Sequence, residues 1–149
     1  MPSASVLRHA RGRFAPRLEL LRRGAVTQVV PRLHVCITCR AGTTPEAGEA
    51  PPGARLHAAL ADLLGESPTL RLAPVACLAN CERGCSAAIS AAGKWTYLLG
   101  GLGPAQAADL LAYAETYAAS ASGTVLPSRR PASLRHAVLG RVPAPELLA

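Results

Sequence analysis

Hydrophobic and polar residues alternate along the first half of the chain in patterns that predict a β-α-β unit. Residues 32–37 alternate and are β-prone, which is typical of a strand. Leucines at helical spacing then predict an amphipathic helix that begins near Pro52 and ends at Gly65. Residues 69–76 predict a second strand. We therefore expect two parallel strands joined by a crossover helix.

The second half of the chain predicts an antiparallel hairpin and a second helix. Residues 87–91 and 94–99 are expected to be short strands joined by a turn at Gly93. Pro104 begins a helix whose inner face carries leucine, alanine and tyrosine side chains, and Gly123 follows its end. A β-α-β unit followed by a hairpin and a helix is the α/β thioredoxin-like arrangement, which is the fold class that we predict.

We expect one domain with a tail at each end. Residues 1–30 are predicted to form a flexible basic N-terminal tail, and residues 31–122 the thioredoxin-like domain. Residues 123–149 are predicted to form a proline-rich C-terminal extension that is mostly extended. The leucine and valine residues at 134–139 are expected in a short docked helix within this extension.

Positive charge is concentrated at the start of the chain. The net charge is +7, but residues 1–32 hold seven arginines against one glutamate, whereas the rest of the chain has nine basic and eight acidic residues. The body is therefore nearly neutral, and no apolar run approaches the roughly 20 residues of a membrane span. We expect neither a nucleic acid nor a membrane as partner. The arginines reflect a compositional bias or a basic arm that contacts an acidic partner.

The first residues do not predict export. The apolar run that follows Arg22 and Arg23 is too short and too polar for a signal peptide, and no small-residue cleavage site follows it. We therefore expect a cytoplasmic protein. In that reducing compartment, clustered cysteines favour metal binding or catalysis over structural disulfides.

The five cysteines form two groups. Cys36 and Cys39 come at the end of the first predicted strand, and Cys77, Cys81 and Cys85 follow the second. Because the parallel strands of a β-α-β unit end at the same edge of the sheet, the two groups are expected to meet there. Four thiolates suit either tetrahedral zinc or an iron–sulfur cluster.

Other residues near the cysteines could support such a site. Asn80, Gly84 and Gly42 are expected to adopt positive φ, so that backbone N–H groups turn toward the sulfurs. Arg40 and Arg83 lie within two residues of a cysteine, where their charge could offset an anionic cluster. These features favour a negatively charged metal centre.

The cysteine spacing alone leaves three functions open. They are an iron–sulfur protein for electron transfer, a zinc- or cobalt-binding module without redox activity, and a dithiol oxidoreductase that uses Cys36 and Cys39. Against the third, a proline- and glycine-rich loop follows Cys39, in place of the helix N-terminus that lowers a thiol pKa. The chain shows no Ser/His/Asp order, paired carboxylates or phosphate loop. We therefore expect an electron carrier or metal-binding protein rather than an enzyme.

Several motifs resemble those of known metal-binding proteins. The strand ending in Val-Cys36, the Cys77-Leu-Ala-Asn-Cys81-Glu-Arg-Gly loop and the Gly-Lys-Trp-Thr-Tyr strand are similar to motifs of the thioredoxin-like 2Fe–2S ferredoxins. Residues 32–143 more closely resemble a bacterial family of predicted metal-binding proteins. In that family, Cys-x-x-Cys-Arg, Cys-x3-Cys-x3-Cys and Gly-Lys-Trp-Thr-Tyr occur together.

This resemblance implies one 2Fe–2S cluster for single-electron transfer, with Cys36, Cys77 and Cys81 at ferredoxin ligand positions. The ferredoxins carry their fourth cysteine further along the first loop, where this sequence has none. We expect Cys39 to take that role, and Cys85 is the competing ligand; zinc is the alternative to the cluster. The resemblance also suggests a role in cobalamin, tetrapyrrole or metal metabolism. The partners would be a redox protein and, as a further option, a second copy in a homodimer.

Overall fold

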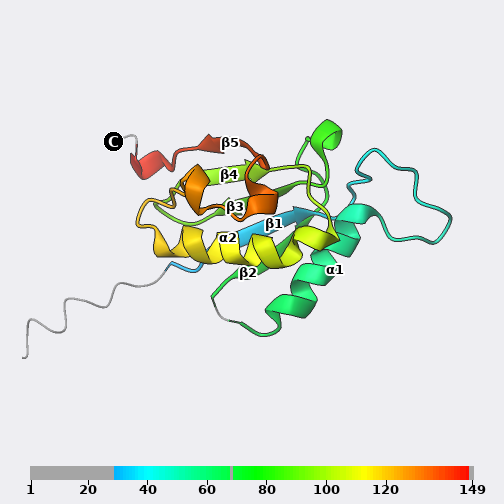
Figure 1. Ribbon diagram of the computed structural model, residues 1–149, viewed down its shortest axis with the longest axis horizontal. Helices are drawn as coiled ribbons and strands as arrows, with labels where there is room; N and C mark the ends of the chain where they lie inside the picture. The colour runs from blue at the N-terminus through cyan, green and yellow to red at the C-terminus, as the bar shows by residue number, and fades with distance from the viewer. Residues whose placement is uncertain (1–28, 68, 148–149) are drawn as a thin grey trace, which may run out of the picture.

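The chain folds into a five-stranded sheet with two α-helices on one of its faces (Figure 1). The computed structural model describes residues 29–67 and 69–147. The strands are β1 (Arg32–Cys36), β2 (Arg71–Val75), β3 (Ala87–Ser90), β4 (Thr96–Leu99) and β5 (Val138–Val142). The helices are α1 (Pro52–Leu64) and α2 (Ala107–Ala119), and short 3-10 turns connect several of these elements.

The strand order in the sheet is β2-β1-β3-β4-β5. β1 and β2 are parallel, and every other neighbouring pair is antiparallel. Cys36 pairs with Val75, so that the last residues of β1 and β2 lie side by side. The segments that follow these two strands therefore leave the sheet at one edge, as the β-α-β pattern predicted.

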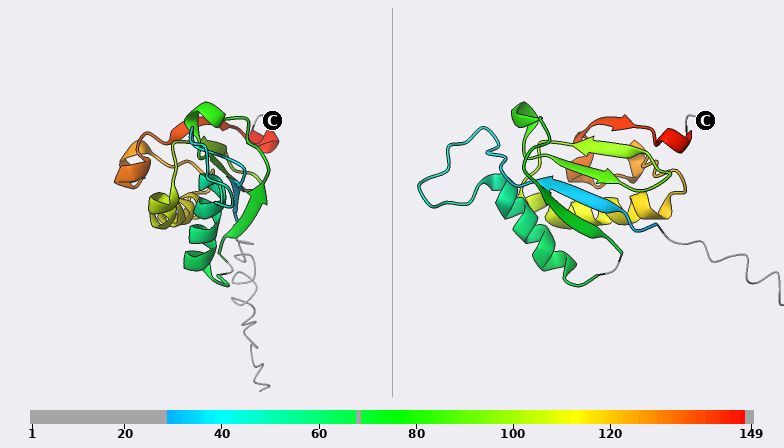
Figure 2. Two further views of the ribbon diagram at one scale, coloured as in Figure 1. Left: turned by 90° about the vertical axis from the view of Figure 1, so that its right-hand side faces the viewer. Right: turned by 180° about the vertical axis from the view of Figure 1, so that it is seen from behind.

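Alternation along the strands determines which face of the sheet the helices cover. Leu33 and Val35 on β1 are buried, as is Ile89 on β3, whereas the residues between them are partly exposed. α1 buries Leu56 and Leu60 of the predicted leucine stripe. Figure 2 shows both helices on the same face of the sheet. The core thus lies between one sheet and one helical layer.

The C-terminal region differs from its prediction. Residues 138–142 form β5, which pairs with β4, and the helix predicted at 134–139 is wrong apart from a single 3-10 turn at Ala132–Leu134. The outer edge of β4 offers unpaired backbone groups, and β5 satisfies them. Val125 and Leu134 of the connecting segment are also buried. This region of the chain therefore contributes to both the sheet and the core.

Two further points concern the predicted N-terminal tail and the length of the helices. The predicted N-terminal tail, residues 1–30, lies outside the described residues except for Val29 and Val30. Among the described residues, neither 13-residue helix nor any shorter one is long and apolar enough to cross a membrane.

Candidate metal centre

The first cysteine pair lies where β1 meets the start of α1. Cys36 is the last residue of β1, and Cys39 follows in the loop; their exposed fractions are only 6% and 7%. The N–H of Gly53, in the first turn of α1, donates to the Cys39 carbonyl at 3.0 Å. A β-carbon at Gly53 would overlap the Cys36 carbonyl oxygen. The absence of a side chain at this position therefore lets the helix close over both cysteines.

The second cysteine pair lies on the loop that follows β2. Cys77 and Cys81 are both exposed. Ala79, between them, has φ 53°, and its N–H donates to the Cys77 Sγ at 3.2 Å. A positive φ is uncommon for a residue with a β-carbon, and here it accompanies the amide contact with the sulfur. A backbone amide of this kind is typical of the hydrogen bonds that orient the sulfur ligands of a metal centre.

The two loops enclose a shared pocket, which we call the thiol pocket. It has a volume of about 480 Å³, and four cysteines line it together with residues of the first loop: Cys36, Thr38, Cys39, Arg40, Ala41, Gly42, Thr43, Cys77 and Cys81. The Thr38 hydroxyl donates to the Ala76 carbonyl, and the Cys36 Sγ donates to the same oxygen at 3.5 Å. These two bonds join the loop after β1 to the loop after β2.

Cys85 occupies a different position from the other four cysteines. It is fully buried and does not line the thiol pocket. Reciprocal backbone hydrogen bonds of 3.1 Å fix it to Leu102, and the peptide bond that joins it to Gly84 is cis. Burial, followed by the neighbouring Cys39, raises the pKa of Cys85 to about 12. Cys85 therefore lies beneath the pocket as a neutral thiol.

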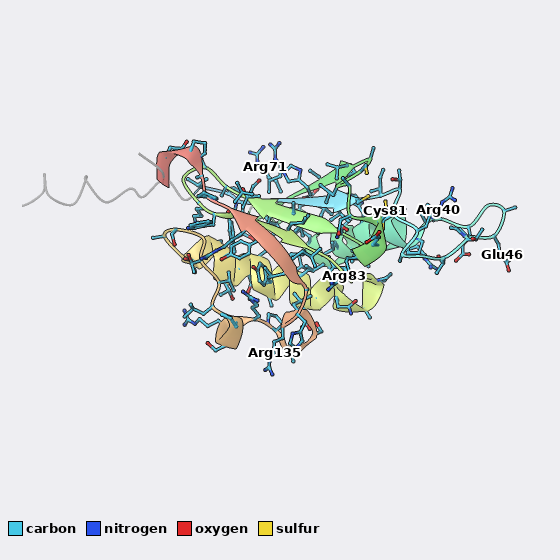
Figure 3. The ribbon with its side chains drawn as sticks, turned by 90° about the horizontal axis from the view of Figure 1, so that it is seen from above. Arg40, Glu46, Arg71, Cys81, Arg83 and Arg135 are labelled. Atoms are coloured by element: carbon cyan, nitrogen blue, oxygen red, sulfur yellow. The ribbon has the colours of Figure 1, made fainter. Side chains whose placement is uncertain are left out.

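One arginine lines the thiol pocket, and a second lies in the turn that follows Cys81. Arg40 lines the pocket, and Arg83 is exposed in the 3-10 turn that begins at Cys81 (Figure 3). Glu82, in the same turn, offsets part of this charge. Arg40 can therefore lower the cost of negative charge in the pocket.

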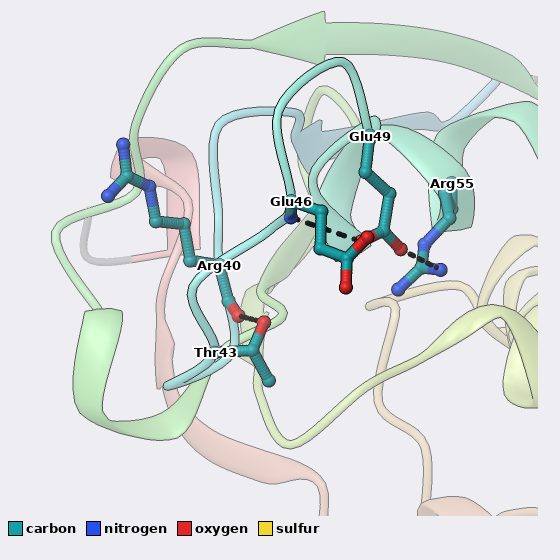
Figure 4. A network of polar contacts seen from close by, with 5 residues as sticks. All are labelled: Arg40, Thr43, Glu46, Glu49 and Arg55. Atoms are coloured by element: carbon teal, nitrogen blue, oxygen red, sulfur yellow. Dashed lines mark hydrogen bonds and ion pairs between the residues drawn. The ribbon is translucent and has the colours of Figure 1, made fainter.

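Hydrogen bonds and an ion pair hold the long first loop in place (Figure 4). The Thr43 hydroxyl donates to the Arg40 carbonyl at 2.6 Å, and the Glu46 N–H donates to the Glu49 carboxylate at 3.4 Å. Glu49 in turn forms an ion pair of 2.8 Å with Arg55 on α1. The wall of the pocket is thus connected to the helix.

The backbone prediction for these loops is only partly correct. Gly42 has φ 74°, as predicted, but φ is −130° at Asn80 and −70° at Gly84. Ala41 and Ala79 adopt the left-handed conformation instead. Asn80 acts through its side chain, whose Nδ2 donates to the Ser86 hydroxyl at 2.9 Å and closes the loop. The sequence contains no signal for a left-handed alanine.

The donor set of the thiol pocket consists of two pairs of thiols, one from each loop. In residues 29–67 and 69–147, no three Cys, His, Asp or Glu side chains gather around a single point as ligands of one metal ion. A two-iron cluster instead takes two protein ligands per iron, which matches a pair from each loop. The chemistry of the four sulfurs therefore fits a 2Fe–2S cluster, although the loops are not already closed around one ion.

The connectivity around Cys39 differs from that of a thioredoxin-type dithiol, in which the helix follows the cysteines directly. Here the start of α1 lies against Cys36 and Cys39 in space, but residues 40–51 separate it from Cys39 in the sequence. Both cysteines are also more than nine-tenths buried, which restricts the approach of a protein disulfide.

A family model described as "Protein of unknown function (DUF1636)" matches residues 33–144. The chain belongs to this family. The match spans all five cysteines of this DUF1636 protein as well as β5. No curated protein matches the sequence.

Two solved structures of a thioredoxin-like [2Fe–2S] ferredoxin from Aquifex aeolicus are similar to this DUF1636 protein. The first is 13% identical, has a TM-score of 0.50, and the alignment covers 78% of this chain and 96% of the ferredoxin. The second, of the wild-type ferredoxin, is 12% identical with a TM-score of 0.47, and the coverage is 75% and 98%. The first likeness confirms the predicted thioredoxin-like fold.

Proposed function

We propose that this DUF1636 protein is an electron carrier that binds one 2Fe–2S cluster in the thiol pocket. The observation that carries the proposal is that Cys36, Cys39, Cys77 and Cys81 line one pocket from two loops. The loops follow adjacent parallel strands whose ends are in register. The fold shared with a [2Fe–2S] ferredoxin is consistent with this assignment.

In this proposal, Cys39 is the fourth ligand and Cys85 is not a ligand. Cys39 lines the pocket with the other three cysteines, whereas Cys85 is buried outside it. Each loop then supplies one pair of thiolates. Cys85 acts beneath the site by packing against Cys39.

The bound cluster would supply one-electron chemistry, and the protein would control charge and access. The Ala79 N–H would stabilise the sulfur of Cys77 as a cluster ligand, because it donates a hydrogen bond to that atom. Arg40 at the pocket favours the added electron, because it lowers the cost of negative charge. Cys77 and Cys81 are exposed, so an electron would reach a partner protein through the loop after β2.

The partner in this proposal is a redox protein, and the compartment is the cytoplasm, where five free thiols stay reduced. Use in cobalamin, tetrapyrrole or metal metabolism is the part of the proposal that rests on the family resemblance alone. A homodimer stays a prediction from the sequence.

The proposal is tested by the composition and spectrum of the protein after purification without oxygen. We expect a coloured protein that contains iron and acid-labile sulfide in equal amounts. Dithionite should bleach its visible absorption and produce a paramagnetic signal at low temperature. Zinc analysis of the same sample provides the comparison.

Other results would contradict the cluster. A colourless protein with stoichiometric zinc or cobalt, and no sulfide, would identify a metal-binding module without redox work. A metal-free protein that reduces disulfides and loses this activity on Cys36→Ser would identify a dithiol enzyme. Either outcome replaces the proposed function.

A further inference from the structure

The edge of the sheet opposite β2 contains a second pocket. Thr124 and the residues up to Pro127, together with Arg130, form one side of it, and β5 forms the other; its volume is about 420 Å³. Tyr97 on β4 also lines it. The cysteines lie after β1 and β2, whereas this pocket lies at β4 and β5, across the width of the sheet. It is therefore separate from the thiol pocket.

We propose that this second pocket, the arginine pocket, binds the oxyanion of a small organic molecule: a carboxylate or a phosphate monoester with an apolar body. The residues that would hold the oxyanion are Arg130, Arg141 and Tyr97. All three line the pocket.

The charge of the arginine pocket favours an anion. Arg130 and Arg141 contribute two guanidinium groups, and no aspartate or glutamate lies among the lining residues. In the described part of the chain, neither arginine forms an ion pair. Two unneutralised guanidinium groups at one pocket attract an anion, and their planar forks suit carboxylate or phosphate oxygens.

The hydrogen bonds of Arg130 leave much of its donor capacity unused. Its Nη1 and Nη2 donate to the carbonyls of Arg135 and Val125, both at the long distance of 3.4 Å. Its Nε is buried and has no partner among the described residues. A guanidinium carries five N–H donors, and a buried donor without an acceptor is costly. A bound oxyanion would supply the missing acceptors.

Tyr97 supplies a further donor. Its hydroxyl oxygen accepts from the Val125 N–H at 3.3 Å and from the Arg141 Nη1 at 3.5 Å. These two bonds fill the two lone pairs of the oxygen, so its proton remains to be donated. Tyr97 is 1% exposed, and no described residue accepts this proton. The side chains of Tyr97, Arg130 and Arg141 therefore all offer hydrogen-bond donors at the pocket.

The apolar residues that line the pocket indicate what kind of molecule would carry the oxyanion. Leu126, Pro127, Val138 and Leu139 give the pocket apolar walls. A charged group alone gains nothing from such walls, but an aromatic or aliphatic body would be removed from water there. We therefore expect phenyl phosphate and benzoate to bind more tightly than inorganic phosphate.

Trp95 provides a direct readout, because it is the only tryptophan in the chain. The Arg141 guanidinium lies over its ring, 4.3 Å from the centroid. Titration of the full chain with phenyl phosphate, benzoate or inorganic phosphate, at constant ionic strength, should change the Trp95 emission to saturation. The relative affinities of the first two ligands then separate a phosphate monoester from a carboxylate as the preferred group.

Calorimetry on variants tests the assigned residues. Arg130→Gln and Arg141→Gln should each weaken binding by about tenfold or more, since each removes charge-assisted hydrogen bonds. Arg130→Lys should restore only part of the affinity, because an ammonium keeps the charge but lacks the fork. Arg135→Gln is the matched control, because Arg135 is exposed and does not line the pocket. Its affinity should equal that of the unaltered protein.

A ligand-dependent rise of the melting temperature of the unaltered protein tests binding without any substitution. The inference is overturned if none of the three probes gives a saturable signal and a melting-temperature rise. It is also overturned if Arg135→Gln weakens binding as much as Arg130→Gln, since the effect is then one of general charge. If Arg130 only anchors its own segment, Arg130→Gln lowers the melting temperature but leaves the affinity unchanged.

Discussion

The Sγ of Cys39 packs against Gly84, in the space that a β-carbon would occupy at that position. Gly84 precedes Cys85, so this contact lies next to the buried cysteine that packs beneath the thiol pocket. Glycine is therefore required at this position because there is no room for a side chain. Its φ is −70°, so a positive φ is not the reason. This contact makes the position of Cys39 sensitive to a single methyl group.

Gly84→Ala should displace the Cys39 sulfur and prevent the pocket from holding a cluster. Overpacking of this kind costs about 1–3 kcal/mol in the free energy of unfolding. Iron and sulfide content and denaturant unfolding measure the two effects. Gly140→Ala is the control, because a β-carbon at Gly140 meets no other atom within 4 Å. If the Gly84 variant binds a full cluster, Cys39 is not held as described.

Substitution of single cysteines should separate ligands from the buried thiol. Cys36→Ser, Cys39→Ser, Cys77→Ser and Cys81→Ser are each expected to abolish or strongly alter the cluster spectrum, because each removes one thiolate from the proposed set. Anaerobic visible spectroscopy and iron analysis provide the measurement.

Cys85→Ala is the informative partner of that series. It should leave the cluster spectrum in place and lower the free energy of unfolding by about 1 kcal/mol, as expected for a small cavity in the core. Loss of the cluster in Cys85→Ala, together with its retention in Cys39→Ser, would assign the fourth ligand to Cys85.

Ala79→Gly should stabilise the protein by up to about 1 kcal/mol, because glycine adopts a positive φ without the steric cost that alanine bears. Ala58→Gly, at an exposed position of α1, is the opposite case and should destabilise by about 1 kcal/mol. Urea unfolding of both variants tests the left-handed conformation of Ala79. A destabilising effect of Ala79→Gly would contradict it.

Tyr113→Phe should raise the free energy of unfolding by up to about 1 kcal/mol. The Tyr113 hydroxyl is buried without a hydrogen-bond partner among the described residues, and its ring would keep its edge contact with Tyr97, at 6.1 Å between centroids. Tyr97→Phe should instead destabilise the protein, since the Val125 and Arg141 donors would lose their acceptor. Thermal unfolding distinguishes the two variants.

The buried Tyr113 side chain also predicts that the free energy of unfolding depends on pH. Burial raises the pKa of Tyr113 above its ordinary value of 10.0. Above that pH, the unfolded chain loses a proton that the folded chain keeps, so the stability from this group is complete below pH 10.0 and decreases as the pH rises. Unfolding free energies measured from neutral to alkaline pH should fall less steeply in Tyr113→Phe. Equal slopes would contradict a raised pKa.

Most of the fold could be predicted from hydrophobic periodicity. The leucine stripe of α1 and the alternation in β1 are strong local signals, and Pro52 and Gly65 mark the helix ends. β5 escaped prediction because Gly140 and Arg141 interrupt its apolar residues, and only pairing with β4 makes it a strand. Local sequence carries little information about such a partner-dependent strand.

The candidate site was predictable to a similar extent. Cysteine spacing and parallel strands were sufficient to predict that the loops after β1 and β2 meet. The backbone conformations within these loops could not be predicted. Ala79 has a positive φ although its residue type gives no sign of it, and Gly84 has a negative φ although glycine is the residue type expected to have a positive one. The hydrogen bond from Thr38 to Ala76 could not be predicted either. It joins two loops that are far apart in the sequence and forms only once the folded sheet brings them together.

The unequal exposure of the two thiol pairs determines which would be damaged first. Cys77 and Cys81 face solvent, whereas Cys36 and Cys39 are more than nine-tenths buried. Chelators, peroxides and alkylating reagents should therefore reach the outer pair first. The inner pair would stay as reduced thiols, so after reversible oxidation of Cys77 and Cys81 to a disulfide or sulfenic acid, reduction of these two residues would restore a chain that can be loaded again. Alkylation of the outer pair would instead be permanent.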